Sequence, residues 1–258
     1  MNVKDTKYAF GTQFPTKSSG TCTIIKYENA RNIYVMFEDG TLTKVTGGNL
    51  CSGSISNPNR PTVFGFGIND AGLEDSTDKR YVLWTSIIRR SYSEVYHKSK
   101  PSYKDVRVSE DWRRLSNFIK DIEKLPNFDL AVSENWELDK DLLGGDQKLY
   151  SNNTCCFLPR ELNTLFTSES KKGLKKGVFY NKRLGKFTAS VNRGGNVRSH
   201  IGVYKTEKEA HFNYCKEKQK HLDSLILKYG DKLPQNVKFK LKDWFIKQNM
   251  MEDIKVDN

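Results

Sequence analysis

The chain has 258 residues, of which 36% are hydrophobic and 29% are charged. A chain of this length and apolar content can bury a core, and it fits two or three modest domains better than one large domain. The formal net charge of +12 favours a polyanionic partner, because clustered lysine and arginine release counterions from phosphate groups. A general role in solubility is the alternative explanation of the charge.

Neither a membrane span nor a secretion signal is predicted. No apolar run of about eighteen residues occurs, and the first ten residues, MNVKDTKYAF, lack the apolar stretch of a signal peptide. We therefore expect a cytoplasmic protein that does not contact a membrane. The five cysteines form no CxxC pair, so we expect reduced and mostly buried thiols rather than a zinc site.

The first part of the chain, residues 1–68, is expected to form a small β-barrel or β-sandwich. Its short segments rich in β-branched and aromatic residues are separated by turn signals at Asp39-Gly40 and Gly47-Gly48. Apolar residues alternate along 32–37, which predicts one buried face and one exposed face. Residues 69–77 belong to a stretch rich in asparagine, proline and glycine and are expected to be a linker.

The second part, residues 78–167, is expected to be an α+β domain. A helix is predicted to follow Asp78, because Trp84, Ile87, Ile88 and Tyr92 fall at helical spacing. A second helix is expected to begin at Ser109 as its N-cap. Arg89 and Arg90 lie beside the first apolar stripe, and both a binding role and a solvated surface stay open for them. The side chains that the second helix would bury are Trp112, Leu115, Phe118, Ile119 and Ile122.

The third part, residues 175–229, is expected to form a three-stranded antiparallel sheet followed by a helix. Strand-like runs at 178–180, 186–192 and 197–201 are separated by turns that contain glycine. Thr206 and Glu209 form a capping box for a helix that continues to a glycine stop. A last amphipathic helix is predicted over 234–250.

Positive charge gathers in this third part. Residues 169–220 hold fourteen basic and four acidic residues, so they carry ten of the twelve net charges. A nucleic-acid-binding face explains this concentration better than uniform solubility, although a solvated sheet face is the alternative. Alternate strand positions share a face, and arginine, asparagine and hydroxyl groups suit DNA bases and phosphates. The polar set is Lys186, Thr188, Ser190 and Asn192, joined by Arg183, Arg193, Arg198 and His200, while Phe187, Ala189 and Val191 are expected to pack on the helix.

The stretch KGVFYNKRLGKFTASV, followed by IGVYKTEKEAHFNY, resembles the AP2 DNA-binding domain over about fifty residues. In that family a three-stranded sheet packs on one helix and reads the DNA major groove. The resemblance implies double-stranded DNA as the partner, with RNA as the alternative. Phe179 and His200 differ from residues common in the family, so no DNA sequence preference transfers. The groove-facing positions that it implies are Tyr180, Lys182, Arg183, Lys186, Thr188, Ser190, Asn192, Arg198 and His200.

The middle region contains LDKDLL and LYSNNTCCF within residues 138–166, preceded by IIRRSY and SYKDVRVSEDW. Together these motifs resemble phage-borne HNH homing-type endonucleases, which often carry AP2 domains and have inactive relatives. HNH chemistry needs a hairpin and a helix that hold one divalent metal, and a histidine that activates water. None of the four histidines lies within 138–166, and Thr154 stands where the family has asparagine.

The middle domain is therefore expected to be a degenerate HNH-like domain that keeps its shape without cutting DNA. The alternative is an active homing-type endonuclease in which Asp139, Asp141 and Asn163 form a nonstandard site for Mg²⁺ or another divalent cation. Without that activity no cofactor or metal is expected. A third hypothesis is an adaptor that binds a protein partner through residues 1–68 and interferes with a host system, in the host cytoplasm if a phage encodes it.

Overall fold

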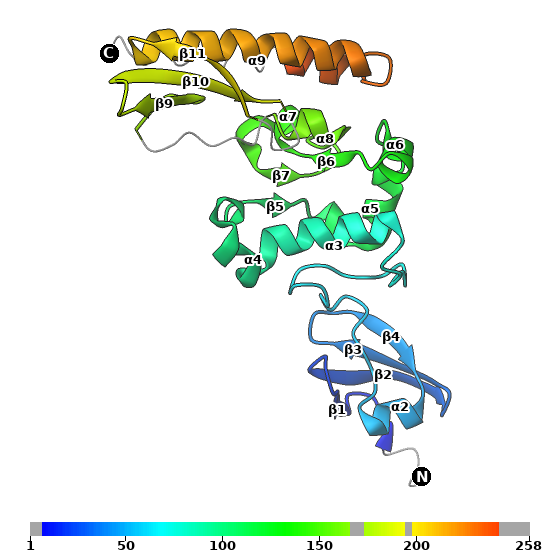
Figure 1. Cartoon of the computed structure of the whole chain (residues 1–258). Helices are drawn as coiled ribbons and strands as arrows, with labels where there is room; N and C mark the ends of the chain where they lie inside the picture. Colours follow the sequence, from blue (N-terminus) through cyan, green and yellow to red (C-terminus); the bar gives the residue numbers. More distant parts are fainter. Residues whose placement is uncertain (1–6, 166–172, 194–197, 243–258) are drawn as a thin grey trace. The chain divides into compact units, whose positions relative to one another are not determined.

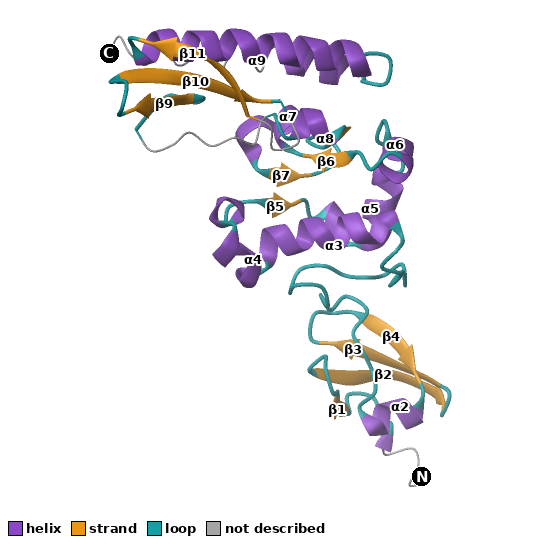
Figure 2. Cartoon of the chain, in the orientation of Figure 1, coloured by secondary structure: helices purple, strands orange, loops and turns teal. Residues whose placement is uncertain are grey.

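The computed structural model describes residues 7–165, 173–193 and 198–242. Helices and antiparallel strands are both abundant, which confirms the predicted α+β class (Figure 2). The chain divides into two compact units, one of Met1–Lys104 with Glu110–Phe118 and the other of Asp105–Ser109 with Ile119–Asn258. This division passes through the 78–167 range that we expected to form one domain.

The first unit begins with a four-stranded antiparallel sheet of order β1-β2-β3-β4 (Figure 1). In the described residues it is an open meander, so neither the closed barrel nor the two-sheet sandwich that we expected is formed. The short helix α2 follows at Gly47–Ser52 and is capped by the Thr46 hydroxyl. The strands are β1 (Gln13–Pro15), β2 (Thr21–Asn29), β3 (Asn32–Phe37) and β4 (Leu42–Val45).

The predicted alternation and turn in this sheet are confirmed. Ile33, Val35 and Phe37 are buried, because every second residue of β3 faces the core. Gly40 has a φ of 81° in the β3–β4 turn, a backbone conformation that glycine adopts without strain. The Asp39 carboxylate accepts the backbone N–H of Thr41 at 3.0 Å and so stabilises the same turn.

Helix α3 (Lys79–Tyr92) begins after Asp78 as predicted, and the Asp78 carboxylate accepts the backbone N–H of Arg80 at 2.9 Å. Helix α4 (Glu94–Ser99) and the 3₁₀ turn η1 (Pro101–Tyr103) follow directly. Trp84, Ile87 and Ile88 are buried, whereas Tyr92 is half-buried.

The next helix, α5 (Leu115–Ile122), does not begin at Ser109, so that prediction is wrong. Residues Asp111–Arg113 form the 3₁₀ turn η2 instead, and the indole N–H of Trp84 donates to the carbonyl of Trp112 at 2.8 Å. The cap comes from a distant residue, because the Asp70 carboxylate accepts the backbone N–H of Ser116 at 2.9 Å. A cap so far away in the chain has no local sequence signal.

The second unit contains two small sheets and several short helices. Strand β5 (Arg107–Val108) pairs in parallel with β7 (Leu149–Tyr150), and β6 (Glu137–Asp139) pairs antiparallel with β8 (Cys156–Leu158). The β6–β8 pair is followed by α8 (Arg160–Asn163). The other elements here are α6 (Phe128–Ser133), α7 (Asp141–Gly144) and the 3₁₀ turn η3 (Gly145–Gln147).

The rest of the second unit is the predicted three-stranded sheet with its helix. The strand order is β11-β10-β9, from β9 (Val178–Asn181), β10 (Lys186–Asn192) and β11 (Arg198–Tyr204). Figure 1 shows α9 (Glu207–Tyr229) lying along one face of this sheet. The Thr206 hydroxyl accepts the backbone N–H of Glu209 at 3.2 Å, which confirms the predicted N-cap.

The remaining predictions on the fold concern the last helix, the membrane and the cysteines. Residues 235–242 are helical, whereas 243–250 of the predicted last helix lie outside the described residues. In the described chain no helix combines the length and the apolarity that crossing a bilayer requires. All five cysteines are free thiols, and Cys22, Cys155 and Cys156 are buried.

Candidate nucleic-acid interface

The two faces of the β9–β10–β11 sheet differ sharply in chemistry. Ala189, Val191 and Val178 are buried against Ala210 and Tyr214 of α9 and form a small core. The opposite face, which we call the outer face, carries the alternate residues of β10 and their partners on the neighbouring strands, because paired residues of antiparallel strands point the same way. The outer face is formed by Phe179, Asn181, Lys186, Thr188, Ser190, Asn192, Arg198, His200 and Val203.

The turn between β9 and β10 adds two cations at the edge of the outer face. The Asn181 side-chain oxygen accepts the backbone N–H groups of Arg183 at 3.1 Å and Leu184 at 3.2 Å. Such bonds hold a tight turn in one conformation. Lys182 and Arg183 are therefore displayed at a fixed turn, and both are exposed.

A cation–π contact fixes the position of Arg198 on the outer face. Its guanidinium carbon lies 4.6 Å from the centroid of the Phe179 ring. The two residues belong to the two edge strands of the sheet, so the Arg198 side chain reaches across β10. A stacked guanidinium loses less side-chain freedom on binding than an unrestrained one.

Acidic residues are absent from the sheet, whereas its helix carries both acidic and basic residues. Residues 173–205 contain eight basic and no acidic residues. In the described structure Lys182, Arg183, Lys186 and Arg198 form no ion pair. The acidic residues of this part of the chain lie on α9, where a hydrogen bond from Lys220 lowers the pKa of the Glu217 carboxyl. The outer face is thus positive, and the negative groups lie on the helix.

Two of the predicted contact residues point to the opposite side of the sheet, and a third has a buried hydroxyl. Tyr180 pairs with Phe187 in the register, and their rings are 5.1 Å apart, so Tyr180 points to the helix side and not to the outer face. Arg193 forms an ion pair with Glu217 of α9 at 3.1 Å, so it also points to the helix side. Ser190 is on the outer face, but its hydroxyl is buried and has no hydrogen-bond partner in the described structure.

Three outer-face residues were not predicted from the sequence, namely Phe179 and Asn181 on β9 and Val203 on β11. The loop from 182 to 185 pairs Asn181 with Lys186, and this register fixes the phase of the whole β9 strand. Counting back from that pair would have placed Phe179, rather than Tyr180, on the same face as Thr188. The signal was therefore present in the length of the turn.

The three residues predicted as catalytic lie within residues 137–163, which we call the β6–β8–α8 segment, and each has another structural use. The Asp139 carboxylate accepts the backbone N–H groups of Asp141 at 3.1 Å and Leu142 at 2.8 Å, which caps α7. The Asp141 carboxylate contacts the buried ammonium group of Lys140 at 2.6 Å. The Asn163 amide donates to Glu137 at 2.6 Å.

Burial shifts the pKa values of several groups in this segment. Burial raises the pKa of the Asp139 carboxyl to about 6 and the pKa of the Cys155 thiol to about 12. The Cys156 thiol, next to Asp139 in the strand register, also has a raised pKa because it is buried. Across the described residues, no group of three or more histidine, cysteine or carboxylate side chains is arranged to hold a metal ion.

Thr154, which replaces an expected asparagine, is buried and bonded within a turn. Its hydroxyl donates to the carbonyl of Leu149 at 2.6 Å, and it accepts the backbone N–H of Ser151 at 3.1 Å. These bonds saturate the side chain inside the protein. Thr154 therefore supports the turn between β7 and β8 and presents no group to solvent.

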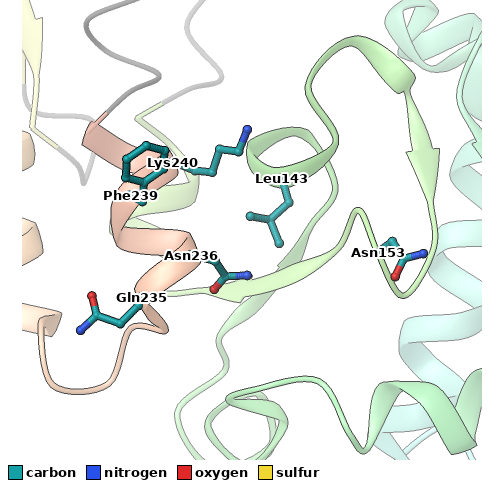
Figure 3. A pocket seen from close by; sticks show the side chains of 6 residues that line it. All are labelled: Leu143, Asn153, Gln235, Asn236, Phe239 and Lys240. Atoms are coloured by element: carbon teal, nitrogen blue, oxygen red, sulfur yellow. The ribbon is translucent and has the colours of Figure 1, made fainter.

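A cavity of 610 Å³ in the second unit lies outside both candidate sites (Figure 3). Its wall combines amide, ammonium and apolar side chains. Neither the outer-face residues nor the three predicted catalytic residues line it, so it gives no support to a catalytic centre at Asp139. The lining residues are Leu143, Asn153, Gln235, Asn236, Phe239 and Lys240.

Comparisons with protein-family models, with curated proteins and with solved structures each found no match to this chain.

Proposed function

We propose that this chain binds double-stranded DNA through the outer face of the β9–β10–β11 sheet. The observation that carries the proposal is the absence of acidic residues from the sheet, since residues 173–205 have eight basic and no acidic residues. Among the described residues, four of these cations lie on or beside the outer face without an ion pair. A solvated surface without a partner is normally laced with both signs of charge. A continuous positive face matches a phosphate backbone instead.

The side chains of the outer face suit two kinds of DNA contact. Lys182 and Arg183 lie at the turn, where long cations can reach phosphate oxygens and set the orientation of the sheet. Arg198 and Asn192 project from strands, where an arginine can donate to guanine and an asparagine can contact adenine in the major groove. The resemblance to the AP2 domain supports the same mode of binding.

We further propose that the HNH-like segment has no nuclease activity. Asp139 caps a helix, Asp141 contacts Lys140 and Asn163 bonds Glu137, so each of the three side chains is already held by another group of the protein. Incubation of plasmid and phage DNA with the protein and Mg²⁺ or Mn²⁺ tests this. We expect no nicks, and cleavage that is lost in Asp139→Ala would establish the endonuclease alternative.

Fluorescence anisotropy with duplex DNA across a salt series tests the binding proposal. We expect the affinity to fall steeply with salt, because each phosphate contact releases counterions. Arg183→Ala with Arg198→Ala should weaken binding, since loss of the Arg198 base contact costs about 1–3 kcal/mol and loss of the Arg183 phosphate contact weakens binding to all sequences alike. Flat, negligible binding at low salt would remove the proposal, and clearly tighter binding to duplex RNA would change the partner.

A matched control is available on the other side of the same sheet. Lys208 and Lys216 are exposed on α9, so Lys208→Ala with Lys216→Ala removes the same charge from the helix. We expect this variant to bind DNA nearly as tightly as the unchanged protein. An equal loss in both double variants would indicate a general charge effect and not a binding face.

A further inference from the structure

We propose that a second surface, in the first unit, binds the DNA phosphate backbone. This α4 surface consists of Arg89, Tyr96, Lys98, Lys100, Tyr103 and Lys104. The inference depends on the proposed function, since it takes the same duplex DNA as the ligand. The outer face of the sheet would contact the bases, and the α4 surface would add phosphate contacts that do not depend on the DNA sequence.

Aromatic contacts join the parts of the α4 surface into one patch. The guanidinium carbon of Arg89, near the end of α3, lies 5.6 Å from the centroid of the Tyr96 ring on α4. The Tyr96 ring meets the Tyr103 ring of η1 edge to face, with centroids 5.5 Å apart. The imidazole of His97 also contacts the Arg90 carbonyl through Nε2 at 2.9 Å, which fixes α4 against the end of α3.

The charge of this patch is strongly one-sided. Residues 89–104 contain five basic residues and a single acidic residue, Glu94. Lys98, Lys100 and Lys104 are exposed, and none is in an ion pair with a described residue. Three ammonium groups therefore remain available to an external anion.

Several basic residues elsewhere in the same unit form ion pairs with neighbouring carboxylates. Arg80 pairs with Asp78 at 2.6 Å, and Arg114 pairs with Asp70 at 3.4 Å. Carboxylates are thus available in this unit but do not accompany the lysines of the α4 surface.

The α4 surface has too little exposed apolar area to insert into a lipid membrane. Among the described residues 89–104, Val95 is the only large apolar side chain that is exposed. A phosphate backbone is the ligand that fits, and lysine binds it as a point charge without base specificity.

The test measures how the affinity of the full chain for a labelled random-sequence duplex depends on salt concentration. Lys98→Ala, Lys100→Ala and Lys104→Ala are combined in one variant. We expect the slope of log affinity against log salt to become shallower by about 2–3, because each phosphate that a lysine neutralises contributes about 0.9. The ranking of different DNA sequences should stay unchanged.

The control variant combines Lys17→Ala, Lys26→Ala and Lys44→Ala, which removes the same charge from the N-terminal sheet of the same unit. We expect its slope to equal that of the unchanged protein. Thermal unfolding should be alike in all three proteins, since the substituted side chains lie at the surface.

The outcomes separate the two proposals. A slope that the α4 variant leaves unchanged, in a protein that binds DNA, overturns the second surface and leaves the sheet proposal intact. Equal loss of slope in the control also overturns it, because the effect would then be one of total charge. If the α4 variant loses slope while Arg183→Ala with Arg198→Ala has no effect, the second surface stands and the sheet proposal fails. Absence of any DNA binding by the unchanged protein overturns both.

Discussion

The outer face of the β9–β10–β11 sheet and the β6–β8–α8 segment were both predicted from the sequence to have a DNA-directed role, yet they use their polar residues in opposite ways. On the outer face, Lys186 and Arg198 point away from the core without an ionic partner among the described residues. In the β6–β8–α8 segment, Asp139 and Thr154 bond backbone groups of their own neighbourhood. Polar residues in a motif therefore indicate a binding surface only where the fold leaves their hydrogen-bonding groups free.

The sharpest way to break this comparison is to substitute two arginines on opposite sides of one sheet. Arg198→Ala should weaken duplex binding by about 1–3 kcal/mol, since it removes an outer-face donor. Arg193→Ala should cost less than about 0.5 kcal/mol, because its side chain pairs with Glu217 on the helix side. Anisotropy titrations at one salt concentration measure both, and equal losses would contradict the assignment of faces.

Removal of the Asp139 carboxylate should affect stability and leave DNA binding unchanged. Asp139→Ala leaves the backbone N–H groups of Asp141 and Leu142 without their acceptor, which should lower the free energy of unfolding by about 1–3 kcal/mol. Urea denaturation measures this loss, with the exposed Asp146→Ala as the control. A DNA-binding defect in Asp139→Ala at full stability would show that this segment contacts DNA after all.

The pH dependence of stability should sharpen the same point. The pKa of Asp139 is raised from 3.8 to about 6 by burial, so the folded state holds a proton that the unfolded state has already released. Its contribution to stability is therefore fully present below about pH 4 and lost as the pH rises through about 6. The free energy of unfolding of Asp139→Asn, measured by urea denaturation between these two pH values, should not fall in this way. If it changes with pH as in the unchanged protein, the pKa of Asp139 is not raised.

The smallest expected effect concerns the ring beneath Arg198. Phe179→Leu should weaken duplex binding by about 0.5–1 kcal/mol, because the guanidinium loses its cation–π contact. Phe179→Tyr, which keeps an aromatic ring, is the matched control. The two substitutions Phe179→Leu and Arg198→Ala should be non-additive in a double-mutant cycle, and strict additivity would show that Phe179 does not act through Arg198.

Features that depend on neighbouring residues could be predicted from the sequence alone. Helix α3 follows its Asp78 cap, α9 follows the Thr206 cap, and the alternation along 186–192 separates Ala189 from Lys186 as predicted. They follow from the 3.6-residue period of helices, from the two-residue period of strands, and from capping residues within one turn of the helix start. The concentration of positive charge in 169–220 could also be found from the sequence, because it requires only a count of charged residues.

Features that depend on residues far apart in the chain could be found only in the folded structure. Glu217 drew Arg193 to the helix side of the sheet, and Asp70 moved the start of α5 to Leu115. Likewise, Asn163 bonds Glu137 rather than joining Asp139. In each case the partner is remote in sequence, and a local pattern carries no information on which remote group will meet it, because burial and pairing are settled only when the chain is folded.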